Sequence, residues 1–436
     1  MALRASRDRS MLRTIIEKEC RLTVMMFKFT VGSLLLVVLM ASSALVLTEH
    51  WKKRVDNYSA HCEEFGQELK RAKRYRDVIL RFQRRPQLLS LLNSGFAKSS
   101  NWTIELHGKY DVPRIRGGAI DNAYLRTFIP ADYSRLVIIV MSLLALVLSY
   151  DAINGDRSQG TLQLSLVNSV SRATILMGKY LGILLSVMLP FTAATLIWLI
   201  ILLLRVNRPM EVEMGVRIGI AFILSLLYVS VFIWLGLFTS ILIARPGTSL
   251  TVALLIWTLA IVLYPTSVAK VIELRSNRNW GWELRFRTTT DYPDERTRDR
   301  VEAVHWESLQ RAAARYHFAQ WLLRLTPQAP YDYATAALAR TDVHAYLTWL
   351  SAAHLTDEFL RRWQNEKIRA YPDREIVATN LAEPLDLTGL PTLVEPNEAL
   401  LATLRRIAWD GMLLILYNVI LWLIAYFTFT RSDVRP

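Results

Sequence analysis

Few side chains in this sequence stand at spacings that catalysis or metal binding would use. Glu302 and His305 have the i, i+3 spacing of metal ligands on a helix, and His317 follows further along. One such pair is a weak metal signal, and a solvated helix face is its ordinary explanation. His344 and His354 have no acid or nucleophile beside them in a known motif. We therefore expect no catalytic, metal-binding or cofactor-binding residue in this chain, and so no enzyme.

ATP binding is not expected in this chain either. No Gly-x-x-x-x-Gly-Lys-Ser/Thr loop occurs, so the phosphate cradle of P-loop proteins is absent from the sequence. No Gly-x-Ser-x-Gly elbow of a hydrolase occurs. The formal net charge of +14 could suggest nucleic acid, but the basic residues flank apolar blocks and form no single tract. Attraction to anionic lipid explains them better, and we expect no nucleic-acid partner.

One polar segment between two apolar blocks has residues suited to docking a partner. It runs from Tyr150 to Leu162 and contains two glycines, which permit tight turns. A short amphipathic stretch, residues 161–166, overlaps its end and continues beyond it. A helix lying along the membrane surface there could dock into a groove on a soluble partner and pass force to the membrane. From the pattern alone, an ordinary loop between two helices remains the simpler explanation.

The elements that position this segment are apolar blocks long enough to cross about 30 Å of hydrocarbon. The basic segment before the first block stays in the cytoplasm by the positive-inside rule, and six crossings return the C-terminus there. Three arginines in the 205–217 loop oppose this topology, because it places them outside. The predicted spans are residues 29–48, 134–153, 180–204, 218–244, 249–264 and 410–430.

The intervening segments complete an all-α membrane protein with six transmembrane helices. The long segments 49–133 and 265–409 form a mostly helical external domain. We expect cytoplasmic segments at 1–28, 154–179 and 431–436, and a short external loop at 205–217. Further helices are predicted at 63–82, 298–325 and 341–369, the last capped at Thr341–Asp342.

Two features of the N-terminal region bear on the topology. Residues 11–27 alternate apolar and charged residues at helical spacing, which suits either an interfacial helix or an extension of the first span. Cys20 and Cys62 fall on opposite sides of the membrane, so we predict no disulfide between them.

The polar segment resembles the signature of type-2 ABC export permeases. In that family a Gly-acidic-x-x-x-Gly-Thr-Leu segment precedes a Ser-Arg pair and a Gly-Lys-x-x-Gly start of the next span. The matching positions here are Gly155, Asp156, Gly160, Thr161, Leu162, Ser171, Arg172, Gly178, Lys179 and Gly182.

Other matches to this family lie outside the polar segment. The tail at 429–435 is similar to the family's Arg-x-Asp-Val-Arg ending, and a subgroup with large external insertions shares segments like 86–90 and 339–342. Ser158 departs from the pattern, because the family often has a second acidic residue there. A contact that used this charge is then altered or supplied by another residue.

The resemblance implies that residues 151–172 meet a separate ABC ATPase, which would hold ATP and magnesium. It implies that Asp156 accepts backbone N–H groups at a helix start, that Arg172 pairs with a partner carboxylate or a lipid phosphate, and that Lys179 snorkels at the cytoplasmic interface. The predicted ATPase-coupling residues are Asp151, Gly155, Asp156, Arg157, Gly160, Thr161, Leu162, Arg172 and Lys179.

The resemblance further implies the setting of the protein. It would be a permease subunit of an exporter in a bacterial inner (plasma) membrane, paired with a second permease subunit in a homo- or heterodimer and surrounded by lipid. The sequence identifies no substrate-binding residue. A membrane-anchored receptor or assembly factor acting through the external domain is the alternative. A membrane enzyme is a third hypothesis, for which the sequence offers no recognisable set of catalytic residues.

Overall fold

The computed structural model describes residues 2–95, 101–110, 113–118, 131–167, 171–206, 211–277, 318–375 and 384–431. Within this part of the chain, six helices are long and apolar enough to cross a membrane, which confirms the predicted fold class. These candidate spans are Phe27–Arg71, Tyr133–Ser158, Arg172–Val206, Val212–Leu242, Pro246–Val271 and Leu400–Arg431.

The spans form a bundle around α9. Helix α9 packs against α5, α8, α10 and α16, and it carries the largest share of the buried side chains. Two spans contain a π-helical turn, named η4 and η5. The elements are α2 (Phe27–Arg71), α4 (Tyr133–Leu136), η4 (Val137–Met141), α5 (Ser142–Ser149), α8 (Arg172–Val206), α9 (Val212–Leu242), α10 (Pro246–Thr258), η5 (Leu259–Leu263), α11 (Tyr264–Asn277) and α16 (Leu400–Arg431).

The fourth and fifth spans form a tight hairpin. Helix α9 ends at Leu242 and α10 begins at Pro246, whose fixed φ suits the first helical position. Pro190 lies inside α8, where a membrane helix tolerates proline because neighbouring groups satisfy the freed carbonyl.

The N-terminal helix α1 (Ala2–Met25) is separate from the first span. Met26 between them has an extended backbone, with φ −72° and ψ 133°, so α1 is not an extension of α2. Instead α1 packs along α8. The pattern of apolar residues in 11–27 thus marks a helix face that binds another helix.

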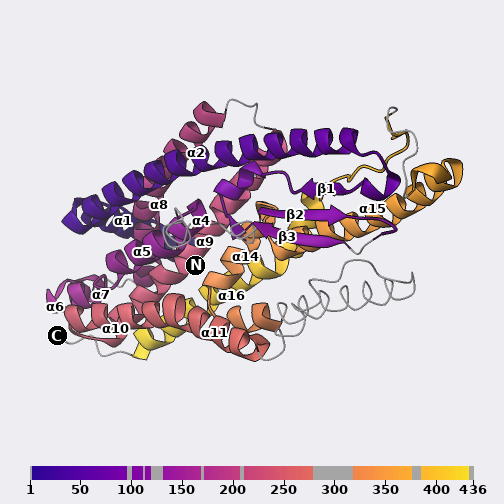
Figure 1. Cartoon of the computed structure of the whole chain (residues 1–436). Coiled ribbons are helices and arrows are strands. Elements are labelled where there is room, and N and C mark those ends of the chain that lie inside the picture. The colour runs from indigo at the N-terminus through magenta and orange to yellow at the C-terminus, as the bar shows by residue number, and fades with distance from the viewer. Residues whose placement is uncertain are drawn as a thin grey trace.

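At the other end of the bundle, short strands and a long helix form a unit that we call the sheet domain, made of the described residues within 72–118 and 339–399 (Figure 1). The described strands make one antiparallel sheet in the order β1-β2-β3, and α15 contacts it. The elements here are η1 (Tyr75–Asp77), β1 (Leu80–Gln83), η2 (Leu88–Leu91), β2 (Asn101–Leu106), β3 (Arg114–Gly118), α15 (Val343–Ala370) and η7 (Pro372–Arg374), with α14 (Gln328–Leu338) between this domain and the bundle.

The sheet was not predicted, and the helix expected at 63–82 is wrong in its second half. Helix α2 runs on without a break from the first span to Arg71, and β1 follows at Leu80. Leu80 pairs with Leu106 of β2, and both are buried in a core shared with Trp349 of α15. Burial of this apolar face outweighs the weak helical pattern there.

The helix predicted at 341–369 is confirmed as α15. Asp342 is its N-cap and accepts a hydrogen bond from the backbone N–H of Ala345 at 3.4 Å. Most of the helix predicted at 298–325 lies outside the described residues, and its described end is helical over 318–323.

The chain returns from α15 to α16 through an extended strap, residues 384–399. Trp363 Nε1 donates to the carbonyl of Thr388 at 2.9 Å, and Lys367 Nζ lies 2.5 Å from Asp386. Hydrogen bonds from Lys367 and Thr388 hold the pKa of Asp386 well below its usual range. These contacts fix the strap to the sheet domain before the chain enters α16.

Candidate functional site

The polar segment folds into two short helices at the end of the bundle opposite the sheet domain (Figure 1). These are α6 (Asn154–Ser158) and α7 (Thr161–Val167). Gly160 joins them with φ 73°, a left-handed conformation that strongly favours glycine. Leu162 is 2% exposed, while Leu164 and Val167 are 68% and 81% exposed. Helix α7 therefore lies on the bundle by one face and presents apolar side chains on the other.

A buried lysine ties α6 to α1 and α8. The Nζ of Lys179 in α8 lies 2.5 Å from Asp156 Oδ2 and 2.8 Å from Glu19 Oε1. Thr161 Oγ1 also donates to Asp156 Oδ1, at 3.1 Å. Lys18 lies 3.9 Å from Asp156 at the edge of this group. Because one ammonium neutralises carboxylates from two elements, a displacement of α6 must disturb both α1 and α8.

Two glycines let α1 approach α8 closely enough for these contacts. A Cβ at Gly178 would lie 2.5 Å from Ile15 Cγ2, and one at Gly182 would lie 2.6 Å from Glu19 Cβ and 3.2 Å from the carbonyl oxygen of Ile16. The Gly-Lys-x-x-Gly motif thus has a local physical role. Its glycines make room for α1, and its lysine pairs with an acid on α1.

Hydrogen bonds join the start of α6 to the α9–α10 hairpin. Ser240 Oγ accepts from the backbone N–H groups of Ile153 and Asn154 at 2.9 and 3.0 Å. Asn154 Nδ2 donates to the carbonyl of Ile243 at 3.1 Å, and Ser249 Oγ donates to the carbonyl of Tyr150 at 3.0 Å. The hairpin therefore fixes the point where the polar segment leaves the second span.

Two further cations make connections near the segment: Lys28 joins it to the first span, and Arg172 joins the start of α8 to the last span. Lys28 Nζ of α2 lies 2.6 Å from Asp151 Oδ2. Arg172 donates from Nη1 to the carbonyls of Phe429 and Thr430, at 2.5 and 2.9 Å. The C-terminal end of α16 carries partial negative charge, which favours a guanidinium there.

One predicted role is corrected by this geometry. Lys179 does not snorkel to the surface. It is 2% exposed, because Glu19 and Asp156 neutralise it inside the bundle. Asp156 accepts from the side chains of Lys179 and Thr161. Arg172 donates to the end of α16 within its own chain, and its pairing with a partner carboxylate or a lipid phosphate stays a prediction.

Of the remaining predicted residues, some pack inside the protein and position α6 and α7, and others lie at the surface. Gly155 has no atom within 4 Å of a potential Cβ, so the structure gives it no steric role. Arg157 is half-buried and lines a hollow of about 390 Å³ with Ile241, Leu242 and Phe427. Ser158 and Gln159 are exposed. Leu162 belongs to the main apolar core, so it positions α7.

Sequence reasoning missed Glu19, Lys28 and Ser240 as partners of this segment. For Glu19 a signal was present, because it follows Ile16 by three residues and Ile15 by four, which puts an acid on the apolar face of α1. Such an acid is buried only with a cation beside it. Lys28 and Ser240 carried no comparable signal.

The metal and disulfide predictions concern other regions. Among the described residues, no group of His, Cys, Asp and Glu side chains could hold a metal ion. The weak candidates Glu302, His305 and His317 lie outside those residues. Cys20 and Cys62 are both free thiols.

Comparison with known families covers nearly the whole chain. A family model described as ABC-2 family transporter protein matches residues 13–434. A comparison with curated proteins gave no match.

Proposed function

The ABC-2 family model matches residues 13–434, so the chain belongs to the ABC-2 transporter family and is a membrane component of an ABC transporter, and we propose that it is an exporter permease driven by a separate ATPase. In this proposal ATP and magnesium bind the ATPase, and two permease chains, identical or different, assemble with two ATPase chains. The assembly resides in a bacterial inner membrane, with both termini of this chain in the cytoplasm.

The observation that carries this proposal is the set of bonds that leave α6 and its flanking residues. They reach α1 and α8 through Lys179, α2 through Asp151 and α9 through Ser240, and Arg172 at the start of α8 connects that helix in turn to α16. A soluble motor that moves α6 and α7 would therefore act directly on α1, α2, α8 and α9, and on α16 through α8. An ordinary loop between two helices needs no such connections.

The surface offered to the ATPase is small and partly apolar. Ser158, Gln159, Leu164 and Val167 are exposed on α6, α7 and the turn between them. The predicted coupling residues Asp151, Asp156, Arg172 and Lys179 hold this surface in place from behind. We propose that Leu164 and Val167 enter a groove on the ATPase and that the charged residues transmit the force.

Replacing Leu164 by glutamate tests this docking surface. Leu164 is 68% exposed, so the change leaves the fold intact, but a carboxylate there would be buried in the ATPase groove. We expect the affinity for the ATPase to fall by at least about tenfold, which corresponds to about 1.4 kcal/mol. The measurement is the amount of ATP-hydrolysing subunit that co-purifies with the tagged chain.

Leu355→Glu is the matched control, because Leu355 is 54% exposed on α15, far from α7. It should retain the ATPase. Equal retention by Leu164→Glu would contradict the docking surface. Absence of any ATPase from the wild-type preparation would overturn the proposed function and favour a membrane-anchored receptor.

The orientation can be tested by cysteine labelling. In a Cys20→Ser, Cys62→Ser background, Ser158→Cys should react with a membrane-impermeant maleimide only after the cells are opened. Ser351→Cys, exposed on α15, should react in intact cells whose outer membrane is permeabilised. The reverse pattern would place α6 and α7 outside and exclude contact with a cytoplasmic ATPase.

A further inference from the structure

Two sequence segments that the coupling site does not use meet where the sheet domain joins the bundle. They are residues 86–90 with the turn after them, and residues 339–342 between α14 and α15. Thr341 Oγ1 donates to the carbonyl of Asn93 at 2.8 Å, and a Cβ on Gly95 would lie 2.7 Å from Thr341 Oγ1. Asn93 Nδ2 donates in turn to Thr335 Oγ1 of α14 at 2.9 Å. The segments are therefore packed as one unit.

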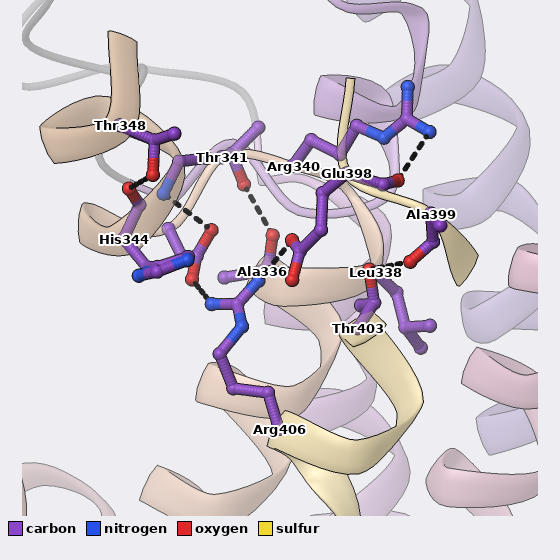
Figure 2. Close-up of polar contacts among 12 residues, drawn as sticks. Ala336, Leu338, Arg340, Thr341, His344, Thr348, Glu398, Ala399, Thr403 and Arg406 are labelled. Atoms are coloured by element: carbon purple, nitrogen blue, oxygen red, sulfur yellow. Dashed lines mark hydrogen bonds and ion pairs between the residues drawn. The ribbon is translucent and has the colours of Figure 1, made fainter. Parts of the chain in front are cut away.

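Beside this unit, three arginines and three carboxylates form what we call the junction cluster, of which Figure 2 shows Arg340, Glu398 and Arg406. Each region contributes one arginine and one acid. Its members are Glu213 and Arg217 of α9, Arg340 and Asp342 of the α14–α15 turn, and Glu398 and Arg406 before and within α16.

Arg217 is the buried centre of the cluster. It is 1% exposed, lies 2.9 Å from Glu213, and donates to the carbonyls of Leu338 and Glu398 at 3.2 and 3.3 Å. A guanidinium so far from water is stabilised only when its N–H groups are paired. Its carbonyl partners therefore fix the end of α14 and the start of α16 to α9.

Arg340 connects the same group to the sheet domain. Its Nη2 lies 2.9 Å from Glu213 and 3.1 Å from the carbonyl of Glu398. Its own carbonyl accepts from Arg84, the residue after β1, at 2.8 Å. Its side chain thus faces the spans and its backbone faces the sheet.

The backbone at Arg340 is unusual. With φ 57° it is the non-glycine residue in the left-handed region within the described part of the chain. That conformation is unfavourable for a residue with a side chain, and glycine adopts it without this penalty. Such conformations persist where the surroundings hold them, and they gather at switch regions. A glycine at position 340 would lack the guanidinium that bonds to Glu213 and to the carbonyl of Glu398.

The sheet domain has a second attachment through α2. This helix continues unbroken from the membrane to Arg71 and contacts β1, and Arg54 donates to Ser90 at 3.0 Å. Two rigid attachments mean that a shift of α9 and α16 relative to α2 must turn or displace the domain.

We propose that the junction cluster transmits movement of α9 and α16 to the sheet domain and that Arg340 is the positioning residue of this linkage. The inference rests on the proposed function, because ATP-driven movement of α6 supplies the motion. Helix α9 receives it directly through Ser240, and α16 receives it from α8 through Arg172, both at the opposite end of the bundle.

The test uses spin labels on the complete complex in nanodiscs, in the background without native cysteines. One pair, Leu204→Cys with Ser351→Cys, reports the distance from α8 to α15. A second pair, Val212→Cys with Ser351→Cys, reports the distance from α9 to α15. Leu204 and Val212 are 77% and 85% exposed. With ATP and vanadate, we expect the first distance to shift by several ångströms, whereas the second should stay constant.

Arg340→Gly is the decisive variant, because glycine accepts the left-handed backbone but lacks the guanidinium. We expect it to retain ATP hydrolysis, to lose at least half of the α8–α15 shift, and to broaden the α9–α15 distance. Arg74→Gly, on the domain surface, should behave as wild type. If Arg340→Gly does not fold, Glu213→Gln replaces it, since it removes the carboxylate shared by Arg217 and Arg340 and should give the same loss.

The possible results distinguish a failure of the junction-cluster proposal from a failure of the proposed transporter function. A full shift in the variant, or no shift in an actively hydrolysing wild-type complex, would overturn the junction as a transmission element. A chain that binds no ATPase would instead overturn the proposed function, and that result appears before any distance is measured.

Discussion

Replacing Lys179 by methionine is expected to destabilise the protein strongly. The ammonium is the shared partner of Glu19 and Asp156, and the side chain of Lys179 is 3% exposed. Methionine fills a similar volume but leaves two carboxylates facing each other without their cation. Removing one member of a buried ion pair costs about 3–5 kcal/mol. The measurement is the thermal unfolding midpoint of the purified complex, read together with the amount of bound ATPase.

Lys18→Met is the matched control for this experiment. Lys18 lies 3.9 Å from Asp156, but its side chain is 46% exposed, and solvent-exposed pairs contribute about 0–1 kcal/mol. The triple variant Lys179→Met, Glu19→Gln, Asp156→Asn should recover at least half of the lost stability, because no uncompensated charge remains. A Lys179→Met protein as stable as wild type would show that these ions do not hold α1 and α6 in place.

The spans could be predicted from sequence because a membrane imposes a constraint that each segment meets alone. A helix in hydrocarbon must satisfy its own backbone and expose apolar side chains, so hydropathy over 18 or more residues identifies it. The polar segment was also recognisable, since Gly160 and the amphipathic residues of α7 are local features.

The partners of the charged residues could not be predicted in this way. Lys179 and Glu19 are 160 residues apart in the chain, and the position of Lys179 at the end of a span is equally compatible with a lysine at the membrane surface. Only the approach of α1, which Gly178 and Gly182 permit, places an acid beside it. Residues that depend on helix packing are therefore assigned wrongly when each helix is considered by itself.

The sheet domain was missed for a different reason. Its strands are four to six residues long, and the two partners of β2 lie on either side of it in sequence with polar residues throughout. Strand propensity depends strongly on burial against other elements, here α15. Since α15 follows β3 by more than 200 residues, the local sequence gives little indication of that burial.

The second large effect is expected at Gly182, where a side chain would separate α1 from α8. A Cβ there would lie 2.6 Å from Glu19 Cβ and 3.2 Å from the carbonyl oxygen of Ile16, so leucine cannot be accommodated unless α1 moves. Overpacking of this kind costs typically about 1–3 kcal/mol. A displaced α1 would also carry Glu19 away from Lys179, which adds the loss of a buried pair. We expect Gly182→Leu to lower the unfolding midpoint and to abolish coupled transport.

The native thiol of Cys20 reports this displacement directly. Cys20 is half-buried, and its backbone nitrogen lies 3.5 Å from the position of a Cβ at Gly182. In a Cys62→Ser background, Gly182→Leu should make Cys20 react with a small maleimide several times faster. Gly219→Leu is the control, because no atom lies within 4 Å of a Cβ at that position of α9. An unchanged rate at Cys20 would mean that α1 remains docked despite the added side chain, and the glycines would then have no part in holding α1 against the coupling segment.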